Sequence, residues 1–232
     1  MANALAHRNI APLAFFFEAA LGLLAIGLGN WCDVDPLENA SLNPETRWQQ
    51  ASAVGWGLLA TLPMLVGLVA LRKIQAGPLG ELNQLVDKQL APLFAEARLW
   101  ELALIALAAG WGEELLFRGW LQTLVTRNIT GGTGLWIGVL LSAAVFGLCH
   151  WITSAYALLA LLAGIYLGIL FLASGNILTS VTTHALYDFV ALVWITRSPA
   201  PPAPAGETKH PVQETCLIQV WPLPASQDDF FR

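Results

Sequence analysis

The fold of this chain is decided by the stretch LALIALAAGWGEELLFRGWLQTLV, residues 102–125, which is apolar almost throughout and long enough to cross a lipid bilayer. Its only formally charged residues are Glu113, Glu114 and Arg118. A charged side chain at the centre of a lone membrane helix costs about 2.5–3.5 kcal/mol on insertion scales. We therefore expect these residues to face a polar, water-accessible pocket inside a helix bundle rather than lipid.

The composition of the whole chain is typical of a polytopic membrane protein. Of its 232 residues, 56% are hydrophobic and 12% are charged, whereas about 25% of the residues in a soluble domain are charged. The net charge of −5 is spread along the chain without a basic run, which argues against nucleic acid as a partner. The cysteines Cys32, Cys149 and Cys216 lie far apart and indicate neither a disulfide framework nor a zinc ribbon.

The apolar residues come in blocks that predict about six transmembrane helices of roughly 20 residues each. The first block is followed by no small-residue cleavage site, so we expect it to remain as a helix. The polar segment 72–99 has amphipathic stretches and is expected to lie along the surface or to form a short helix, and the Pro-rich chain after Ser198 is expected to be disordered. The predicted spans are roughly 12–31, 52–71, 100–126, 134–152, 155–174 and 176–196.

The distribution of basic residues predicts the orientation of these spans. One set of connections and termini carries most of the Lys and Arg residues, whereas the other carries only Arg47 and Arg127. The positive-inside rule then favours both termini in the cytoplasm. The basic residues of the richer side are Arg8, Arg72, Lys73, Lys88, Arg98, Arg197, Lys209 and Arg232.

Ionisable residues also occur in two later spans. His150 ends the stretch VFGLCH, and His184 and Asp188 lie in THALYD. Residues at positions i and i+4 share a helix face, so Asp188 can orient the ring of His184 or join it at one reacting atom. By the same spacing Glu114 can pair with Arg118, and Glu113, rotated by about 100° from Glu114, is left to point elsewhere.

Glutamate, histidine and aspartate side chains that converge in one pocket favour hydrolysis. A carboxylate can take a proton from water, and a histidine can hold that water or help to bind a metal ion. N–H groups can stabilise an oxyanion. Cys149 precedes His150 directly and points about 100° away from it on a helix, so we expect an ordinary buried thiol there rather than a nucleophile.

Three motifs in successive spans resemble those of the CPBP family, the CAAX-processing and bacteriocin-processing (Abi) intramembrane proteases. Their order, spacing and placement in helices agree with the family pattern, and the resemblance covers about residues 98–196. The motifs are Glu113-Glu114-x-x-x-Arg118, Phe146-x-x-x-His150 and His184-x-x-x-Asp188.

The resemblance implies an all-α membrane fold with a buried catalytic cavity and an endopeptidase that acts near the membrane. It assigns Glu113 as the general base for water with help from His150, and it assigns His184 and Asp188 to the oxyanion. Some relatives, the type II CAAX prenyl endopeptidases, trim prenylated substrates, a specificity that we do not carry over. On this basis the chain divides into an N-terminal membrane part at 1–97, a catalytic membrane domain at 98–196 and a tail at 197–232.

Two points of chemistry stay open in this resemblance. Family members are often called metalloproteases, and a zinc ion would take Glu113, His150 and His184 as ligands, but a glutamate mechanism without metal is the competing account. Position 188 is Asp, where the prenyl-protease relatives tend to have Asn. Because an ionised carboxylate repels an oxyanion, Asp188 is either protonated, a metal ligand, or an orienter of His184 as an imidazolium, and we favour the last.

The expected function is thus an intramembrane endopeptidase that cleaves membrane-associated proteins or peptides, with the lipid bilayer as its other partner. A bacterial plasma membrane is the expected location. Two alternatives are a scaffold or chaperone of the same fold without enzymatic activity, and a transporter that uses the buried carboxylates for proton coupling. Against the transporter, the spans show no obvious inverted repeat. The oligomeric state, the substrate and the cleavage site do not follow from the residues.

Overall fold

The computed structural model describes residues 10–38, 46–129 and 131–197. The chain separates into two compact units, Met1–Ser198 and Pro199–Arg232, and all described residues belong to the first. The tail after Ser198, predicted from its Pro content to be disordered, lies outside the described residues.

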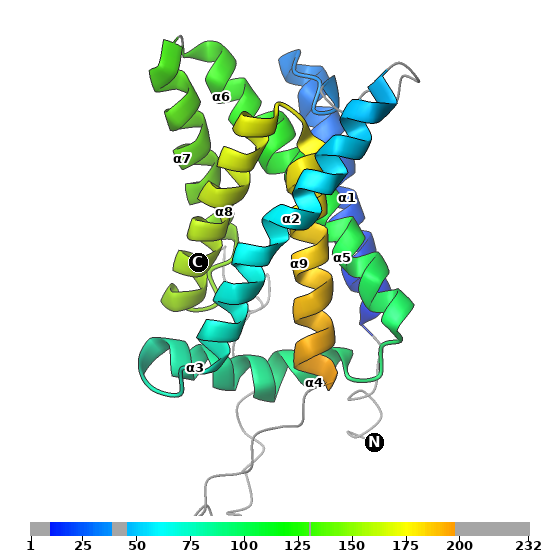
Figure 1. The fold of residues 1–232 in the computed structure, drawn as a ribbon, viewed down its shortest axis with the longest axis vertical. Helices are drawn as coiled ribbons and strands as arrows, with labels where there is room; N and C mark the ends of the chain where they lie inside the picture. Colours follow the sequence, from blue (N-terminus) through cyan, green and yellow to red (C-terminus); the bar gives the residue numbers. More distant parts are fainter. Residues whose placement is uncertain (1–9, 39–45, 130, 198–232) are drawn as a thin grey trace, which may run out of the picture. The chain divides into compact units, whose positions relative to one another are not determined.

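The described residues form helices and no strand, which confirms the all-α class (Figure 1). Most of the helices run up and down side by side, and segments α5, η5 and α6 follow one another without a break. The elements are α1 (Ala11–Cys32), α2 (Arg47–Arg72), α3 (Gly77–Leu85), the π-helical η4 (Val86–Leu90), α4 (Ala91–Phe94), α5 (Leu99–Glu114), the π-helical η5 (Leu115–Gln122), α6 (Thr123–Asn128), α7 (Gly131–Cys149), α8 (Ser154–Ser174) and α9 (Ile177–Arg197).

Among the described residues, five helices are long and apolar enough to cross a membrane: α1, α2, α7, α8 and α9. They match five of the predicted spans. The remaining predicted span, at 100–126, is helical throughout, but its residues 115–122 form the π-helical segment η5 between the α-helices α5 and α6. The fourth span begins and ends three residues earlier than predicted, because α7 runs from Gly131 to Cys149 and His150 lies in the turn that follows.

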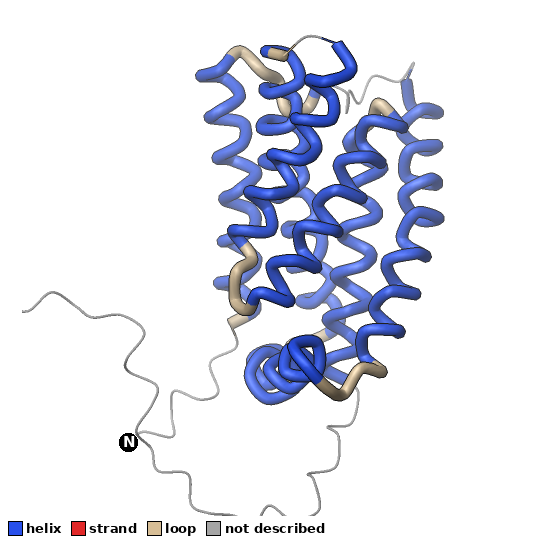
Figure 2. Tube along the Cα trace, turned by 90° about the vertical axis from the view of Figure 1, so that its left-hand side faces the viewer, coloured by secondary structure: helices blue, strands red, loops and turns tan. Residues whose placement is uncertain are grey.

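The segment from α3 to α4 lies across one end of the helices. It runs roughly perpendicular to them, horizontally in Figure 1 and almost end-on in Figure 2. Arg72 at the end of α2 holds it by donating to Asp87 at 2.6 Å, and Arg197 at the end of α9 donates to the carbonyls of Ala95 and Ala97. The surface placement predicted for 72–99 is therefore confirmed.

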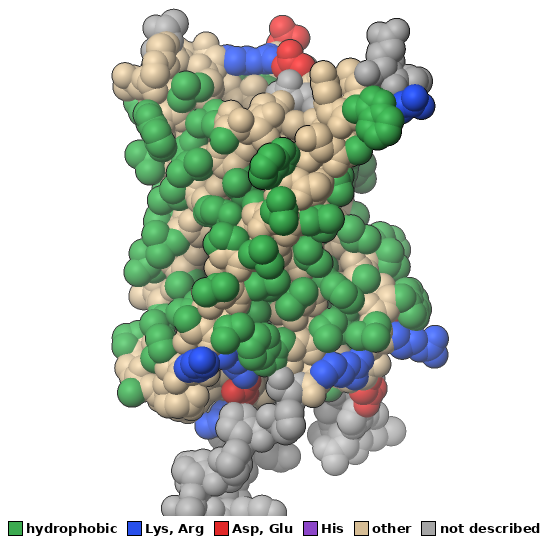
Figure 3. Space-filling model, in the orientation of Figure 1, with side chains coloured by type: hydrophobic (Ala, Val, Ile, Leu, Met, Phe, Trp, Pro, Cys, Tyr) green, Lys and Arg blue, Asp and Glu red, His purple; other side chains and the backbone are tan. Residues whose placement is uncertain are grey.

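The outer face of the helices is apolar. Large hydrophobic side chains are exposed along α1 and α2, including Phe16 at 68% and Trp56 at 63% of their full accessible area, as expected for side chains in contact with lipid. Figure 3 shows this apolar surface, with Lys and Arg side chains gathered near the end where α3 and α4 lie. Cys149 is exposed, so the expectation of a buried thiol there was wrong; because neighbouring helix positions point about 100° apart, it faces outward while His150 faces the interior.

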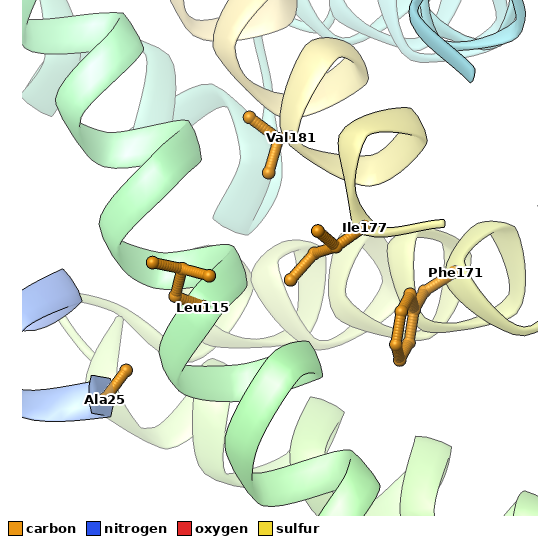
Figure 4. Close-up of a cluster of buried hydrophobic side chains, with 5 residues drawn as sticks. All are labelled: Ala25, Leu115, Phe171, Ile177 and Val181. Carbon is orange, nitrogen blue, oxygen red and sulfur yellow. The ribbon is translucent and has the colours of Figure 1, made fainter. Parts of the chain in front are cut away.

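The interior is built around the α5–η5 helix, which packs against α1 on one side and α9 on the other. A cluster of buried apolar side chains joins four elements at this point (Figure 4). Because these side chains fill the space between helices, they fix the relative register of α1, η5, α8 and α9. The cluster consists of Ala25, Leu115, Phe171, Ile177 and Val181.

Polar side chains cap the N-termini of α8 and α9. The hydroxyl of Thr153 accepts from the Tyr156 N–H at 3.1 Å and so starts α8 shortly after His150. The side-chain oxygen of Asn176 accepts from the Leu178 N–H at 2.9 Å and starts α9. Between these helices Gly175 adopts φ 62°, a left-handed conformation typical of the residue after a helix C-terminus.

Candidate active site

The structure brings all six predicted site residues together in one buried cluster. Glu113 and Glu114 end α5, Arg118 lies in η5, His150 follows α7, and His184 and Asp188 lie on α9. These elements are neighbours because α5 packs on α9 and η5 packs on α7. Residues that are far apart in the sequence therefore form a continuous chain of polar contacts.

Glu114 and Arg118 form the deepest part of the cluster, and both side chains are fully buried. Arg118 Nη1 donates to Glu114 Oε1 at 2.6 Å, which confirms the pair predicted from the i,i+4 spacing. Arg118 Nη2 donates to the carbonyl oxygen of Gly164 on α8 at 3.1 Å. A buried guanidinium is tolerated only when it is paired and hydrogen-bonded, and both conditions hold here.

The π-helical geometry of η5 explains how these donors reach α8. In a π-helix the backbone hydrogen bonds span one residue more than in an α-helix, and such segments are frequent at functional sites. Two carbonyl oxygens of η5 accept from hydroxyl groups: Phe117 from Ser142 at 2.7 Å and Arg118 from Thr123 at 3.0 Å. Gln122, at the end of η5, donates to the carbonyl oxygen of Gly168 at 3.1 Å.

His184 connects this deep pair to the rest of the cluster. Its Nδ1 lies 2.9 Å from Glu114 Oε1, the same oxygen that accepts from Arg118. A carboxylate paired with a guanidinium is an acceptor only, so Nδ1 of His184 carries the proton and donates it to Glu114. The other ring nitrogen, Nε2, is left to face the remaining carboxylates.

Asp188 lies on the Nε2 side of the His184 ring, with Oδ2 at 3.4 Å from Nε2. The side chain of Asp188 is 29% exposed, whereas that of His184 is 8% exposed. Glu114, at 2.9 Å, is thus a nearer partner of His184 than Asp188 is. The i,i+4 spacing of residues along one helix could not reveal this contact between two helices. Asp188 contacts the nitrogen that points toward Glu113.

Glu113 lies between the two histidine rings. Its Oε1 is 3.8 Å from His150 Nε2, and its Oε2 is 3.8 Å from His184 Nε2. These distances exceed a direct hydrogen bond and suit groups that share a small third partner. Glu113 does not pair with Arg118, as expected from the rotation of about 100° between neighbouring helix positions.

His150 is oriented by the residue four positions before it. Its Nδ1 lies 2.8 Å from the carbonyl oxygen of Phe146, which is an acceptor only, so Nδ1 carries the proton and Nε2 presents a lone pair toward Glu113. The rings of Phe146 and His150 lie 4.3 Å apart between centroids, and Arg118 stacks on Phe146 at 4.7 Å. Phe146 thus contacts both Arg118 of the ion pair and the ring of His150. The sequence motif did not show that one ring would make both contacts.

Exposure rises in steps across the cluster. The side chains of Glu114 and Arg118 are 0% exposed, Glu113 is 10% exposed and His150 is 22% exposed. The solvent-accessible side of the cluster is therefore the side of His150 and Asp188. The Glu114–Arg118 ion pair forms the opposite, solvent-excluded side of the cluster, which we call its dry floor.

The arrangement of these side chains bears on whether the site could hold a metal ion. Among the residues that the structure describes, no group of three or more His, Cys, Asp or Glu side chains is arranged to hold one. We derive no catalytic step through a metal from this arrangement.

The comparison with protein families gives one match, which covers residues 95–190. The matching family model is described as type II CAAX prenyl endopeptidase Rce1-like. The matched segment contains all six site residues, and it confirms the family resemblance that the three motifs indicated. No curated protein and no solved structure matches the chain.

Proposed function

We propose, on the premise that residues 95–190 belong to the Rce1-like family, that this chain is an intramembrane endopeptidase in which Glu113 activates water. Its substrates would be membrane-associated proteins or peptides. The observation that carries the proposal is the position of the Glu113 carboxylate, 3.8 Å from Nε2 of both His150 and His184 at the border between a dry floor and an accessible side. A general base must lie within reach of the proton it takes, directly or through one water.

The first step is the activation of water between Glu113 and His150. One water proton points to Glu113 Oε1 and the other to the lone pair on His150 Nε2, because Nδ1 of that ring donates to Phe146. Glu113 takes its proton as the water oxygen attacks the carbonyl carbon of the substrate. A carbon–oxygen bond forms, and the carbonyl electrons move to the oxygen.

The second step is the stabilisation of the resulting oxyanion by His184. Its Nδ1 is committed to Glu114, so only Nε2 can donate toward substrate. The negative charge of Asp188 beside Nε2 favours an imidazolium, whose Nε2–H then points at the oxyanion. Asp188 as a carboxylate accepts hydrogen bonds and does not donate one to the oxyanion, so its part is to support His184.

The third step breaks the peptide bond. Glu113 returns the water proton to the leaving nitrogen, and the carbon–nitrogen bond breaks as the carbonyl reforms. The products are one new carboxyl group and one new amine, and Glu113 is again ionised. Each proton that leaves the water ends on a product, so the cycle needs no cofactor to balance it.

Substrate approach is proposed from the side of His150 and Asp188, the two most exposed members of the cluster. The turn that carries His150 lies at the same end of the helices as α3 and α4, where the basic residues gather. By the positive-inside rule this end is cytoplasmic, with both termini on that side, and we propose a bacterial plasma membrane as the location.

Substrate trapping in native membranes tests the proposal. The Glu113→Gln protein keeps the shape of the site but has no base, so it should retain bound substrate that mass spectrometry identifies, while the wild-type protein releases cleaved products. The matched control is Glu81→Gln, the same change at an exposed position on α3. Equal recovery of uncleaved partners with wild type and Glu113→Gln would favour a scaffold, and proton-coupled solute uptake by wild type would favour a transporter.

A further inference from the structure

A carboxyl group outside the family match reaches the site from α1. Glu18 is half-buried on the face of α1 that packs against α5. The two helices approach closely because Gly112, directly before Glu113, has no side chain: a Cβ there would collide with the Glu18 carbonyl oxygen and lie 3.2 Å from the Gly22 nitrogen. The backbone of α1 thus rests against the residue that precedes the proposed base.

The Glu18 side chain lies next to the Glu113 carboxyl group, with His184 and Asp188 as its other charged neighbours. Each of the two glutamates has a buried Oε2 that receives no hydrogen bond from an N–H or O–H of the described residues. The proposed water activation uses Oε1 of Glu113 and assigns no hydrogen-bond donor to these two Oε2 atoms.

Two carboxyl groups in contact inside a low-dielectric site do not both carry a charge, because their repulsion is large there. One proton between them removes the repulsion and makes one carboxyl group a hydrogen-bond donor to the other. Glu113 must be ionised to act as a base, so the proton resides on Glu18.

We propose that Glu18 is a positioning residue for Glu113: its protonated carboxyl group donates a hydrogen bond to one Glu113 oxygen and turns the other toward the water and His150. This inference rests on the proposed function, which it deepens. It makes α1, at the start of the chain, a part of the active site rather than a membrane support alone.

The kinetic test compares Glu18→Gln with Glu18→Leu. The amide of Gln keeps a donor of similar size, so Glu18→Gln should retain kcat within about tenfold, whereas Glu18→Leu should lose about 10²-fold in kcat with little change in KM, the scale expected for a misplaced catalytic group. The control is Phe17→Ala, which alters the neighbouring, 61% exposed side chain of the same helix. Equal kcat in wild type and Glu18→Leu would overturn the proposal, as would equal losses with Gln and Leu.

A second measurement does not depend on peptidase activity. In a double-mutant cycle of thermal unfolding with Glu18→Leu and Glu113→Leu, the double variant should show a smaller change in Tm than the two single changes added, because each single variant leaves one buried carboxyl group alone. Additive changes would overturn the contact. If the cycle shows coupling but the wild type cleaves nothing, the proposed function fails while the positioning contact stands.

Infrared spectroscopy keeps the inference testable if a Leu variant does not fold. The wild type should show the C=O band of a buried protonated carboxyl group that shifts in D₂O, and this band should be lost in Glu18→Gln. A band that persists unchanged in Glu18→Gln would place the proton elsewhere and overturn the proposal.

Discussion

The Nδ1 atom of His184 donates to Oε1 of Glu114 across 2.9 Å, although the two residues are 70 positions apart in the chain. The same oxygen accepts from Arg118 at 2.6 Å. One carboxylate oxygen thus accepts hydrogen bonds from a guanidinium on η5 and from an imidazole on α9. The adjacent Glu113 makes neither of these hydrogen bonds and remains available to activate water.

Loss of one partner of the buried pair should destabilise the protein strongly. Arg118→Met leaves the buried Glu114 carboxylate without its guanidinium partner and is expected to lower the free energy of unfolding by about 3–5 kcal/mol. The double variant Glu114→Leu/Arg118→Met removes both charges and should recover much of the folded yield. It should nevertheless stay inactive, because His184 loses the acceptor of its Nδ1 proton. Measurements are yield and Tm in detergent together with peptidase activity; an active double variant would contradict the orienting role of Glu114.

Substitution of the water-activating residues should affect rate and leave folding intact. Glu113→Gln and His150→Gln are each expected to lower kcat by about 10²–10⁴-fold, the usual contribution of general acid–base catalysis. The double variant should be hardly slower than the worse single variant, because both residues act on the same water. Melting temperatures near that of wild type serve as the control, and multiplicative losses would indicate separate roles.

Asp188→Asn should retain partial activity. Asn keeps the size of Asp and a carbonyl acceptor for His184 Nε2, and Glu114 still holds the ring by Nδ1. We expect a loss of about tenfold or less in kcat/KM, well below that of His184→Gln. The assay is run with and without a chelator; under the glutamate mechanism neither protein responds to it. Metal loss and chelator sensitivity that appear only in Asp188→Asn would instead identify Asp188 as a metal ligand.

A side chain at Gly168 should disturb the site from the far side of η5. A Cβ there would lie 2.9 Å from Oε1 of Gln122, whose Nε2 donates to the carbonyl oxygen of this same glycine. Overpacking of this kind costs about 1–3 kcal/mol, so Gly168→Ala should lower Tm. Leu162→Ala, at a 52% exposed position on the same helix, is the control. An unchanged Tm in Gly168→Ala would show that α8 can move away from η5.

The orientation of the protein can be measured with single cysteines in a cysteine-free background. Glu81→Cys lies on α3, at the basic end, and Trp48→Cys lies at the opposite end, at the start of α2, where the native side chain is 75% exposed. If the basic end is cytoplasmic, a membrane-impermeant maleimide added outside should modify only Trp48→Cys in spheroplasts. Modification of Glu81→Cys in intact spheroplasts would show that the protein has the opposite orientation.

The helices and the convergence of the six residues follow from local features of the sequence. Apolar blocks of bilayer length set the spans, and the cost of buried charge forces Glu113, His150 and His184 inward, where they meet. The contacts that the sequence did not reveal depend on how helices are rotated against each other. The bond from His184 to Glu114 depends on the rotation of α9 against α5, and the approach of Glu18 depends on the packing of α1 at Gly112.

The π-helical segment η5 was missed for a related reason. Its residues have ordinary helix propensities, so an α-helix was expected over 100–126. Tertiary contacts favour the wider turns: the hydroxyl group of Ser142 donates to a carbonyl oxygen of η5, and Arg118 and Gln122 donate to the backbone of α8. None of these partners is identifiable before the helices are packed.

The Glu114–Arg118 pair also has a consequence for biogenesis. The two residues lie in one continuous helix, and the chain is synthesised from its N-terminus, so α5 and η5 enter the membrane before α9 exists. At that stage neither His184 nor Asp188 can compensate a buried charge. The contact of 2.6 Å between Glu114 and Arg118 needs no other helix, and it offsets two of the three charges of the span within the span itself. The pair that later orients His184 thus first lets its own helix insert, before His184 has been translated.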